Sequence, residues 1–257
     1  MSRRRRGDDI TGVLLLDKPI DLSSNHALQR TKRAFNANKA GHTGTLDPFA
    51  TGLLICCFGK ATKISTLMLE ADKSYRATLS LGVETDSGDL TGEAVQRAEL
   101  AGLDLSRERV LEVLQQFTGE IEQIPPMHSA LKRDGKPLYE YARQGIVLER
   151  EPRKVTIYGI ELLSLEADSM IIDVKSSKGT YIRTLAQDIG RALGCYAHLS
   201  ALRRLSVGDF LLSDAVTLEQ IQKEAEENPA NLQNYLIPLE KVPTKWVPEK
   251  LLKQENL

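Results

Sequence analysis

Strand patterns and helix patterns interleave irregularly along this chain, and that interleaving constrains the fold most. Apolar or alternating segments predict strands at residues 12–17, 53–58, 74–81, 155–165 and 170–175, the last two forming a hairpin. Helices are expected from Ser23 or Ser24 through Phe35, and at residues 61–69, 106–117 and 180–193, and a capping box at Thr217 and Gln220 predicts one more. This order favours an α+β fold with a central mixed, mostly antiparallel sheet flanked by helices and loops.

The composition is that of an ordinary soluble protein. The 257 residues are 41% apolar and 27% charged with a net charge of −1, which fits one large domain or a domain with a small appendage. No apolar run approaches the length of a membrane span, and polar residues rather than a secretory signal follow Arg3–Arg6. Cys56, Cys57 and Cys195 are too few for a disulfide framework or a zinc site, and adjacent cysteines on a strand are most simply core residues. We therefore expect a cytoplasmic protein.

The charges are unevenly distributed although their sum is near zero. Between residues 22 and 46 the charged residues are all basic: Arg30, Lys32, Arg33 and Lys39. Between residues 175 and 208, Asp188 is the single acid among Lys175, Lys178, Arg183, Arg191, Arg203 and Arg204. Such clusters predict a basic face for a polyanion, and the alternative is that each is simply a solvated surface.

Residues 39–52 predict a glycine-rich loop that approaches a ligand. Gly41, Gly44 and Gly52 permit tight backbone geometry, and Asp47 is biased away from helix because Pro48 follows it. Taken alone, Asp47 is also explained as a turn residue and His42 as an ordinary buried histidine. A phosphate-binding P-loop is excluded, because Gly59-Lys60 lacks the upstream glycine and is followed by Ala61.

A second candidate site lies where a strand leads into a helix at residues 177–185. Tyr181 and Arg183 place an aromatic ring beside a permanent cation, which suits base stacking and carboxylate pairing. The alternative is an ordinary helix start with a surface arginine. A third candidate is Lys73-Ser74-Tyr75, in which Tyr75 opens a strand and is otherwise explained by packing.

These segments together resemble the TruB family of tRNA pseudouridine synthases. Gly-His-Thr-Gly-Thr-Leu-Asp-Pro-Phe-Ala-Thr-Gly (41–52) resembles the catalytic loop of that family, and the order of the other motifs also matches. Those motifs are Lys73-Ser74-Tyr75, Lys178 through Leu185, Ala197-His198-Leu199 with Leu202-Arg203-Arg204, Lys18-Pro19 with Ser23-Ser24, Pro126 through Lys132, and Tyr139 through Arg143. The resemblance spans residues 12 to about 210.

The resemblance implies an isomerase that converts uridine-55 in the T-loop of tRNA to pseudouridine. The N1–C1′ bond breaks, the base rotates, and C5 joins C1′, which requires a carboxylate beside C1′ and no metal or cofactor. Asp47 is the implied carboxylate, and we expect Arg183 to pair with its charge. The base has to be flipped out, with Tyr75 and Tyr181 flanking it, Leu202 closing the pocket, and His42 filling the vacated stack. Lys18, Lys63 and the basic cluster at 175–204 are candidate phosphate contacts.

The same resemblance sets expectations for domains and partners. Residues 8–210 form the expected catalytic domain, with an RNA-gripping insertion at about 123–153, and residues 211–257 form a short extension in place of a full PUA-type domain. We expect a monomer that binds the tRNA T-arm without a guide RNA and without a membrane. Asp21 and Ser176 depart from the family pattern, which usually has glycine and often has cysteine there.

Three rival functions fit parts of this pattern. A non-catalytic RNA-binding module would use the basic clusters but has no need of Asp47 near phosphates. An enzyme for small phosphorylated ligands predicts stabilisation by small molecules and indifference to RNA. A guide-RNA-dependent relative predicts no activity of the lone chain on bare tRNA.

Overall fold

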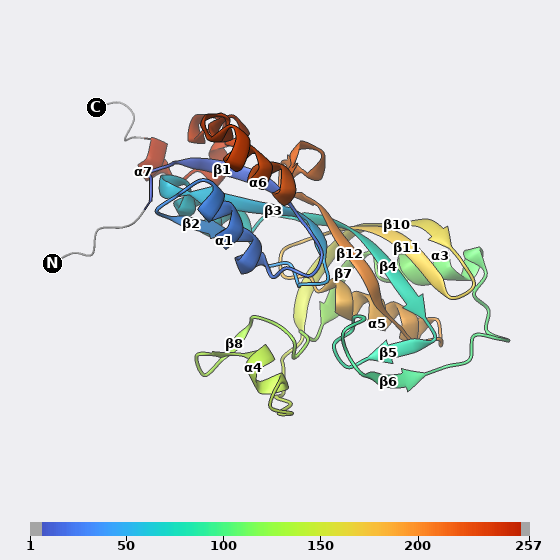
Figure 1. Cartoon of the computed structure of the whole chain (residues 1–257). Helices are drawn as coiled ribbons and strands as arrows, with labels where there is room; N and C mark the ends of the chain where they lie inside the picture. The colour runs from blue at the N-terminus through green and yellow to red at the C-terminus, as the bar shows by residue number, and fades with distance from the viewer. Residues whose placement is uncertain (1–6, 253–257) are drawn as a thin grey trace. The chain divides into compact units, whose positions relative to one another are not determined.

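The computed structural model describes residues 7–252 (Figure 1). The segment Arg3–Arg6 and residues 253–257 lie outside the described residues. The chain divides into two compact units, the first made of residues 1–73 and 203–257 and the second of residues 74–202. The chain leaves the first unit at the start of strand β4 (Lys73–Leu81) and returns within strand β12 (Ala197–Val207).

The first unit contains a sheet in the order β14-β1-β3-β12. Strands β1 (Gly12–Lys18) and β3 (Thr51–Phe58) are antiparallel, whereas β14 (Val216–Thr217) is parallel to β1 and β12 is parallel to β3. Strand β2 (Ala40–His42) pairs with the end of β3, and β13 (Phe210–Leu211) pairs with β12. The register places the last residue of β1, the start of β3 and residues 203–204 of β12 side by side.

Alternating side chains of β1 and β3 feed two separate cores. Leu14, Leu16 and Cys56 pack with α1 (Ser24–Ala34), α6 (Leu218–Glu227) and η3 (Pro229–Tyr235) on one face. Val13 and Cys57 face the other side, toward η1 (Gly59–Ile64), α2 (Ser65–Leu69), η4 (Leu239–Lys241) and α7 (Glu249–Leu252). Short turns η2 (Leu212–Asp214) and η5 (Thr244–Trp246) complete the unit. The prediction that Cys56 and Cys57 are core residues is confirmed.

Side-chain caps fix the starts of three helices, and those at Ser23 and Thr217 were predicted from the sequence. The Ser23 hydroxyl accepts the amide of His26 at the start of α1. Thr217 and Gln220 form the predicted capping box of α6. Ser106 caps α3 (Arg107–Gln116) in the second unit. Each cap satisfies an amide that the helix itself cannot, which contributes about 1 kcal/mol.

The second unit contains strands in the order β12-β4-β11-β10-β7. Strands β10 (Arg153–Leu165) and β11 (Ser169–Ser176) form the predicted antiparallel hairpin, and β7 (Gly119–Gln123) is antiparallel to β10. Helix α3 packs against β10 and α5 (Ile182–Ala192), and β5 (Val83–Thr85) pairs with β6 (Ala94–Arg97) in a small separate sheet. The predicted α+β class with a mixed, mostly antiparallel sheet is confirmed.

Residues 124–152 leave the sheet of the second unit between β7 and β10, and this segment is called the insertion below. It contains the short hairpin β8 (Lys132–Arg133) and β9 (Lys136–Pro137) followed by α4 (Leu138–Ala142) (Figure 1). Lys136 lies 4.7 Å from the ring centre of Tyr141, and the Arg143 guanidinium lies 5.3 Å from that of Tyr139. The insertion therefore presents aromatic rings with cations against them.

Two sequence predictions of local structure are wrong in part. Residues 39–52 are not entirely loop, because Gly41 and His42 lie in β2 and β3 begins at Thr51. Pairing with the neighbouring strand satisfies the backbone there despite the glycines. The helix expected at 61–69 begins at Gly59 as a 3₁₀ helix and becomes α-helical from Ser65. No helix among residues 7–252 is long and apolar enough to cross a membrane.

Candidate active site

Asp47 lies in the segment that joins β2 to β3, residues 43–50, which is called the catalytic loop below. The side chain is half-buried, and its own carbonyl accepts the amide of Ala50 at 3.1 Å, which closes a tight turn. At Gly52 the backbone has a φ of +99°, and a Cβ there would lie 2.4 Å from the carbonyl oxygen of Arg204. Glycine is therefore required where the loop returns to the sheet.

Ser24 binds the residue immediately before Asp47. Its hydroxyl donates to the Leu46 carbonyl at 2.9 Å and accepts the Leu46 amide at 2.7 Å. Ser24 is 1% exposed and Leu46 is 4% exposed, so water does not replace these bonds. One side chain thus satisfies both backbone groups of Leu46, as a neighbouring strand would.

Lys18 and Arg204 bind the catalytic loop on either side of Leu46. Lys18 Nζ donates to the carbonyls of Pro19 (2.9 Å), Leu22 (2.6 Å) and Pro48 (3.3 Å). Arg204 donates from Nη2 to the Gly44 carbonyl at 3.3 Å and from Nε to the Leu53 carbonyl at 2.7 Å. The carbonyls of residues 44, 46 and 48 are therefore each held by a buried side chain. Those side chains, Lys18, Ser24 and Arg204, are called the clamp below.

The predicted role of Lys18 as a phosphate contact is wrong. Lys18 is 0% exposed, and its ammonium is directed at three backbone carbonyls. Burial lowers the pKa of Lys18 to about 8, although the nearby charge of Asp47 opposes that shift. A second cation, Arg204, lowers this pKa further. Lys18 is thus a structural cation beside the catalytic loop.

His42 ends β2 directly before the catalytic loop, where it pairs with Cys56 of β3. Burial lowers the pKa of His42, and the charge of Arg204 lowers it further. A neutral imidazole is favoured at neutral pH, so the ring is suited to stacking rather than to attracting phosphate. This environment is compatible with its predicted position in an RNA stack.

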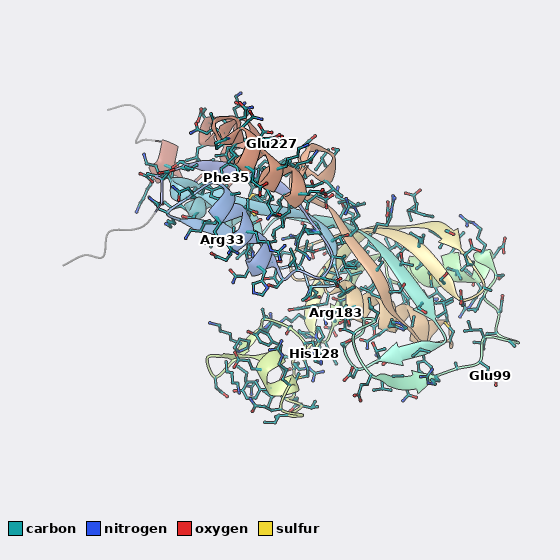
Figure 2. The ribbon with its side chains drawn as sticks, viewed as in Figure 1. Arg33, Phe35, Glu99, His128, Arg183 and Glu227 are labelled. Atoms are coloured by element: carbon teal, nitrogen blue, oxygen red, sulfur yellow. The ribbon has the colours of Figure 1, made fainter. Side chains whose placement is uncertain are left out.

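Arg183 lies near the start of α5 in the second unit and is 6% exposed. Its Nη1 donates to the Ser87 carbonyl at 3.1 Å and lies 3.3 Å from the Asp89 carboxylate, and its Nη2 donates to the His128 carbonyl at 2.6 Å. Figure 2 labels Arg183 and His128, which come from α5 and from the insertion. The guanidinium therefore joins three separate segments of the second unit.

Tyr181 is the residue that precedes α5, and its backbone is fixed by Gln123 at the end of β7. Gln123 Oε1 accepts the Tyr181 amide at 3.0 Å, and Gln123 Nε2 donates to the Tyr181 carbonyl at 3.3 Å. Tyr181 is half-buried, as is Tyr75 on β4. Both rings are thus partly accessible on structured elements, as stacking requires.

The basic cluster predicted at 175–204 is not one exposed patch. Arg183 and Arg204 are buried, Arg191 pairs with Glu84, and Arg203 pairs with Asp17 at 2.6 Å. Lys175 and Lys178 are exposed. Arg183 and Arg204 bind carbonyls distant in sequence and are buried, whereas Arg191 and Arg203 stay partly exposed but are paired with carboxylates. Arg30, Arg33, Lys39, Lys60 and Lys63 of the first unit are exposed.

Within residues 7–252, no three His, Cys, Asp or Glu side chains are grouped as a metal site. Two cations of the clamp, Lys18 and Arg204, bind carbonyls of the carboxylate-bearing loop, and the Arg183 guanidinium binds two carbonyls and a carboxylate of the second unit.

Comparison with known families gives the class of the protein. Residues 32–182 match the model of the TruB family pseudouridylate synthase N-terminal domain, and residues 183–242 match that of the tRNA pseudouridylate synthase B C-terminal domain. The chain belongs to the TruB family.

Curated TruB relatives match nearly the whole chain. The tRNA pseudouridine synthase B of Bordetella avium is 64% identical over 95% of this chain and 98% of its own length. The protein of the same name from Bordetella pertussis is 66% identical over 89% of this chain and 94% of its own length. A third, from Nitrosococcus oceani, is 52% identical over 95% of this chain and 79% of its own length.

Solved structures similar to this chain include larger assemblies. A chain of a Cbf5–Nop10–Gar1 complex has a TM-score of 0.72 and 31% identity, over 92% of this chain. This chain spans 62% of that protein. A chain of an H/ACA RNP bound to a substrate RNA containing 2′-deoxyuridine has a TM-score of 0.66 and 27% identity, over 96% of this chain and 68% of that one.

The TruB site residues predicted from sequence fall into both units. Asp47 and His42 lie in the first unit, and Tyr75, Tyr181, Arg183 and Leu202 lie in the second, with Leu202 7% exposed. The pairing of Asp47 with Arg183 and the enclosure of a flipped base join residues of different units and stay predictions.

Four residues that touch the site machinery were given no such role by the sequence analysis: Ser24, Asp89, Gln123 and Arg204. Asp89 follows Gly88 in the polar turn 85–92. The carboxylates of this turn are the sequence signal from which a partner for Arg183 could have been predicted. Ser24 and Arg204 stand inside matched motifs but act on backbone atoms, which no residue pattern reveals.

Proposed function

We propose that this chain isomerises uridine-55 in the T-loop of tRNA to pseudouridine, with Asp47 as the catalytic carboxylate. Membership of the TruB family and relatives named tRNA pseudouridine synthase B support the reaction and the substrate. The observation that carries the assignment of Asp47 is its loop, in which the carbonyls of residues 44, 46 and 48 are held by buried side chains. A carboxylate on such a loop is held in place before substrate arrives, which lowers the entropic part of the barrier.

The charge pattern of the first unit also favours a polyanionic substrate. From residue 22 to residue 69, Asp47 is the single acid against six lysines and arginines. Those six are Arg30, Lys32, Arg33, Lys39, Lys60 and Lys63. A surface that only binds RNA gains nothing from a carboxylate among its basic residues, because the carboxylate repels phosphate. The presence of Asp47 therefore favours an enzyme over a non-catalytic RNA-binding module.

The base-flipping step is assigned to the second unit. Tyr75 and Tyr181 flank the flipped uridine, with base stacking worth about 1–3 kcal/mol, and Leu202 closes the pocket. Arg183 supplies the cation for Asp47, and His42 occupies the gap left in the RNA stack. The insertion grips the T-loop through its exposed lysines and arginines and its cation–aromatic pairs.

The chain is proposed to act as a monomer on bare tRNA, in the cytoplasm and without guide RNA. Relatives at 64% and 66% identity are named for tRNA, whereas the chains of the Cbf5–Nop10–Gar1 complex and of the H/ACA RNP are matched at 31% and 27% identity. Cys56, Cys57 and Cys195 are free and buried, which suits a reducing compartment.

The test is conversion of an unmodified tRNA transcript by the purified chain, read as a base whose glycosidic bond resists cleavage. Wild-type protein is expected to modify the T-loop uridine, and Asp47→Asn is expected to fold and bind tRNA with less than about a thousandth of that rate. The exposed carboxylate variant Asp104→Asn serves as the control. Turnover by Asp47→Asn would exclude the assignment of Asp47, and stable binding without turnover by the wild type would favour the binding module.

A further inference from the structure

We propose that Ser24 is a positioning residue for Asp47, acting through the backbone of Leu46. This inference rests on the proposed function and adds a residue that fixes the geometry of the same site. Ser24 and Lys18 bind the two residues that flank Asp47, but of the clamp residues Ser24 alone engages both an amide and a carbonyl of the catalytic loop, at 2.7 and 2.9 Å. The peptide group that leads into Asp47 contains the Leu46 carbonyl.

The hydroxyl of Ser24 cannot be replaced by water or by a neighbour without moving the loop. Leu46 is 4% exposed, so loss of the hydroxyl leaves a buried donor and a buried acceptor unsatisfied. The loop is then expected to shift until these groups find partners. Because Lys18 still holds Pro48 and Arg204 still holds Gly44, the shift concentrates on Leu46 and Asp47 between them.

The same geometry excludes a direct role for Ser24 in substrate binding. Its side chain is 1% exposed and its hydroxyl is committed to Leu46 in both directions. Removal of the hydroxyl should therefore lower kcat and leave KM for tRNA nearly unchanged. A displacement of about 1 Å at a reacting group can cost about a hundredfold in rate.

Ser23 provides a matched control, because it is the adjacent serine at the start of the same helix. Its hydroxyl accepts the His26 amide at 3.2 Å and caps α1. Ser23→Ala should lower the Tm by weakening the helix start, with no effect on the catalytic loop. The pair of variants separates loss of stability from loss of positioning.

The experiment measures kcat, KM and Tm for the full chain on an unmodified tRNA transcript, for wild type, Ser23→Ala, Ser24→Ala and Ser24→Cys. Ser24→Ala is expected to lose about 10- to 100-fold in kcat with KM within about threefold of wild type. Ser23→Ala is expected to keep kcat within about twofold despite a lower Tm. Equal kcat losses in the two alanine variants, or a loss confined to KM, would overturn the role of Ser24.

Ser24→Cys keeps the inference testable where Ser24→Ala does not fold. The thiol is close in size to the hydroxyl but bonds weakly and at longer distance, so an intermediate kcat is expected. A folded Ser24→Cys variant with the wild-type kcat would overturn the inference. Wild-type protein that forms no pseudouridine would instead overturn the proposed function, and the inference with it.

Discussion

Asp47 in the first unit and Arg183 in the second are held by different kinds of contact. The position of Asp47 is fixed through its neighbours, whose carbonyls are bound by the clamp. Arg183 is fixed through its own guanidinium, which binds the Ser87 and His128 carbonyls and the Asp89 carboxylate. The difference follows from size and charge. A short carboxylate is placed by its backbone, whereas a long cation has to be held at its tip to lose its rotamer freedom.

The two units also differ in how much of their functional surface is rigid. The catalytic loop is bound by buried side chains. The insertion contains a short hairpin, with two residues in each strand, and a short helix, and many of its side chains are exposed. A fixed carboxylate suits chemistry, and an accessible basic segment suits recognition of an RNA fold. The comparison predicts that changes in the two places affect different kinetic constants.

After Asp47→Asn, the largest effect is expected for Arg183→Lys, which removes the guanidinium fork that binds several acceptors at once. A lysine ammonium cannot reproduce those directions, so kcat should fall by about a hundredfold or more. The rate of pseudouridine formation at saturating tRNA is the measurement. Arg191→Lys is the control, because Arg191 lies on the same helix and also pairs with a carboxylate, Glu84. Similar losses in both variants would show that Arg183 has no special role.

A smaller effect, on KM rather than kcat, is expected for charge reversal in the insertion. Lys132→Glu combined with Arg133→Glu reverses the charge of two exposed basic side chains of β8. The expected result is a roughly tenfold higher KM for tRNA and a weaker dependence of binding on salt, with kcat nearly unchanged. Arg97→Glu is the control, because it reverses the charge of an exposed arginine on β6, and it should leave KM close to wild type. A fall in kcat alone would contradict the assignment of the insertion to RNA binding.

Above pH 8, the clamp predicts opposite changes in stability and in rate. The pKa of Lys18 is about 8 in the folded protein and near 10.5 in the unfolded chain. Between pH 8 and 10.5 the unfolded chain therefore binds more protons than the folded protein does. The free energy of unfolding should therefore rise with pH in that window, by on the order of 1 kcal/mol for each pH unit. The neutral amine has two donors for three carbonyls, so the catalytic loop loosens and kcat should fall severalfold.

Lys18→Met separates these effects from other titrations. The slope of unfolding free energy against pH should be smaller in this variant than in wild type between pH 8 and 10, measured by denaturant titration. Identical slopes would show that Lys18 keeps an ordinary pKa in the folded protein.

The smallest effect is expected at Ser176, which lies on β11 and has no part in the proposed site. Its side chain is 0% exposed, and its hydroxyl has no hydrogen-bond partner among the described residues. Ser176→Ala should therefore raise the free energy of unfolding by about 0.5–1 kcal/mol, with kcat and KM unchanged. Ser200→Ala is the control, because Ser200 is exposed on β12 and donates to the Thr78 carbonyl. A lower Tm for Ser176→Ala would show that the hydroxyl has a partner in solution.

Sequence patterns predicted the parts of the fold that depend on neighbours in the chain. Ser23, one of two serines expected to cap the first helix, and Thr217 cap their helices, since each acts on an amide three residues away. The helix expected at 106–117 is also present, and its cap at Ser106 was not predicted. The β10–β11 hairpin follows in the same way from adjacent segments. Strand β2 was missed because its pairing with β3 offsets the low strand propensity of its glycine.

In the site, residue types were predictable but their surroundings were not. The motif that contains Asp47 named the carboxylate, and the same motifs named Arg183 and the two tyrosines. The partner of Arg183, Asp89, lies 94 residues away in sequence, and the Arg203 partner Asp17 lies 186 residues away. No local rule connects such pairs, because they are brought together by strand order.

Sequence patterns alone assigned the residue types for the chemistry and the approximate starts of most helices and strands. The burial of Lys18 and Arg204, which the sequence predicted as surface cations, and their hydrogen bonds to carbonyls follow from contacts that form only in the folded chain. The physical reason is that a buried cation is tolerated only where several acceptors converge. The acceptors of Lys18 lie in the segment after β1 and in the catalytic loop, and those of Arg204 lie in the catalytic loop and in β3. The two buried cations therefore support the loop that carries Asp47.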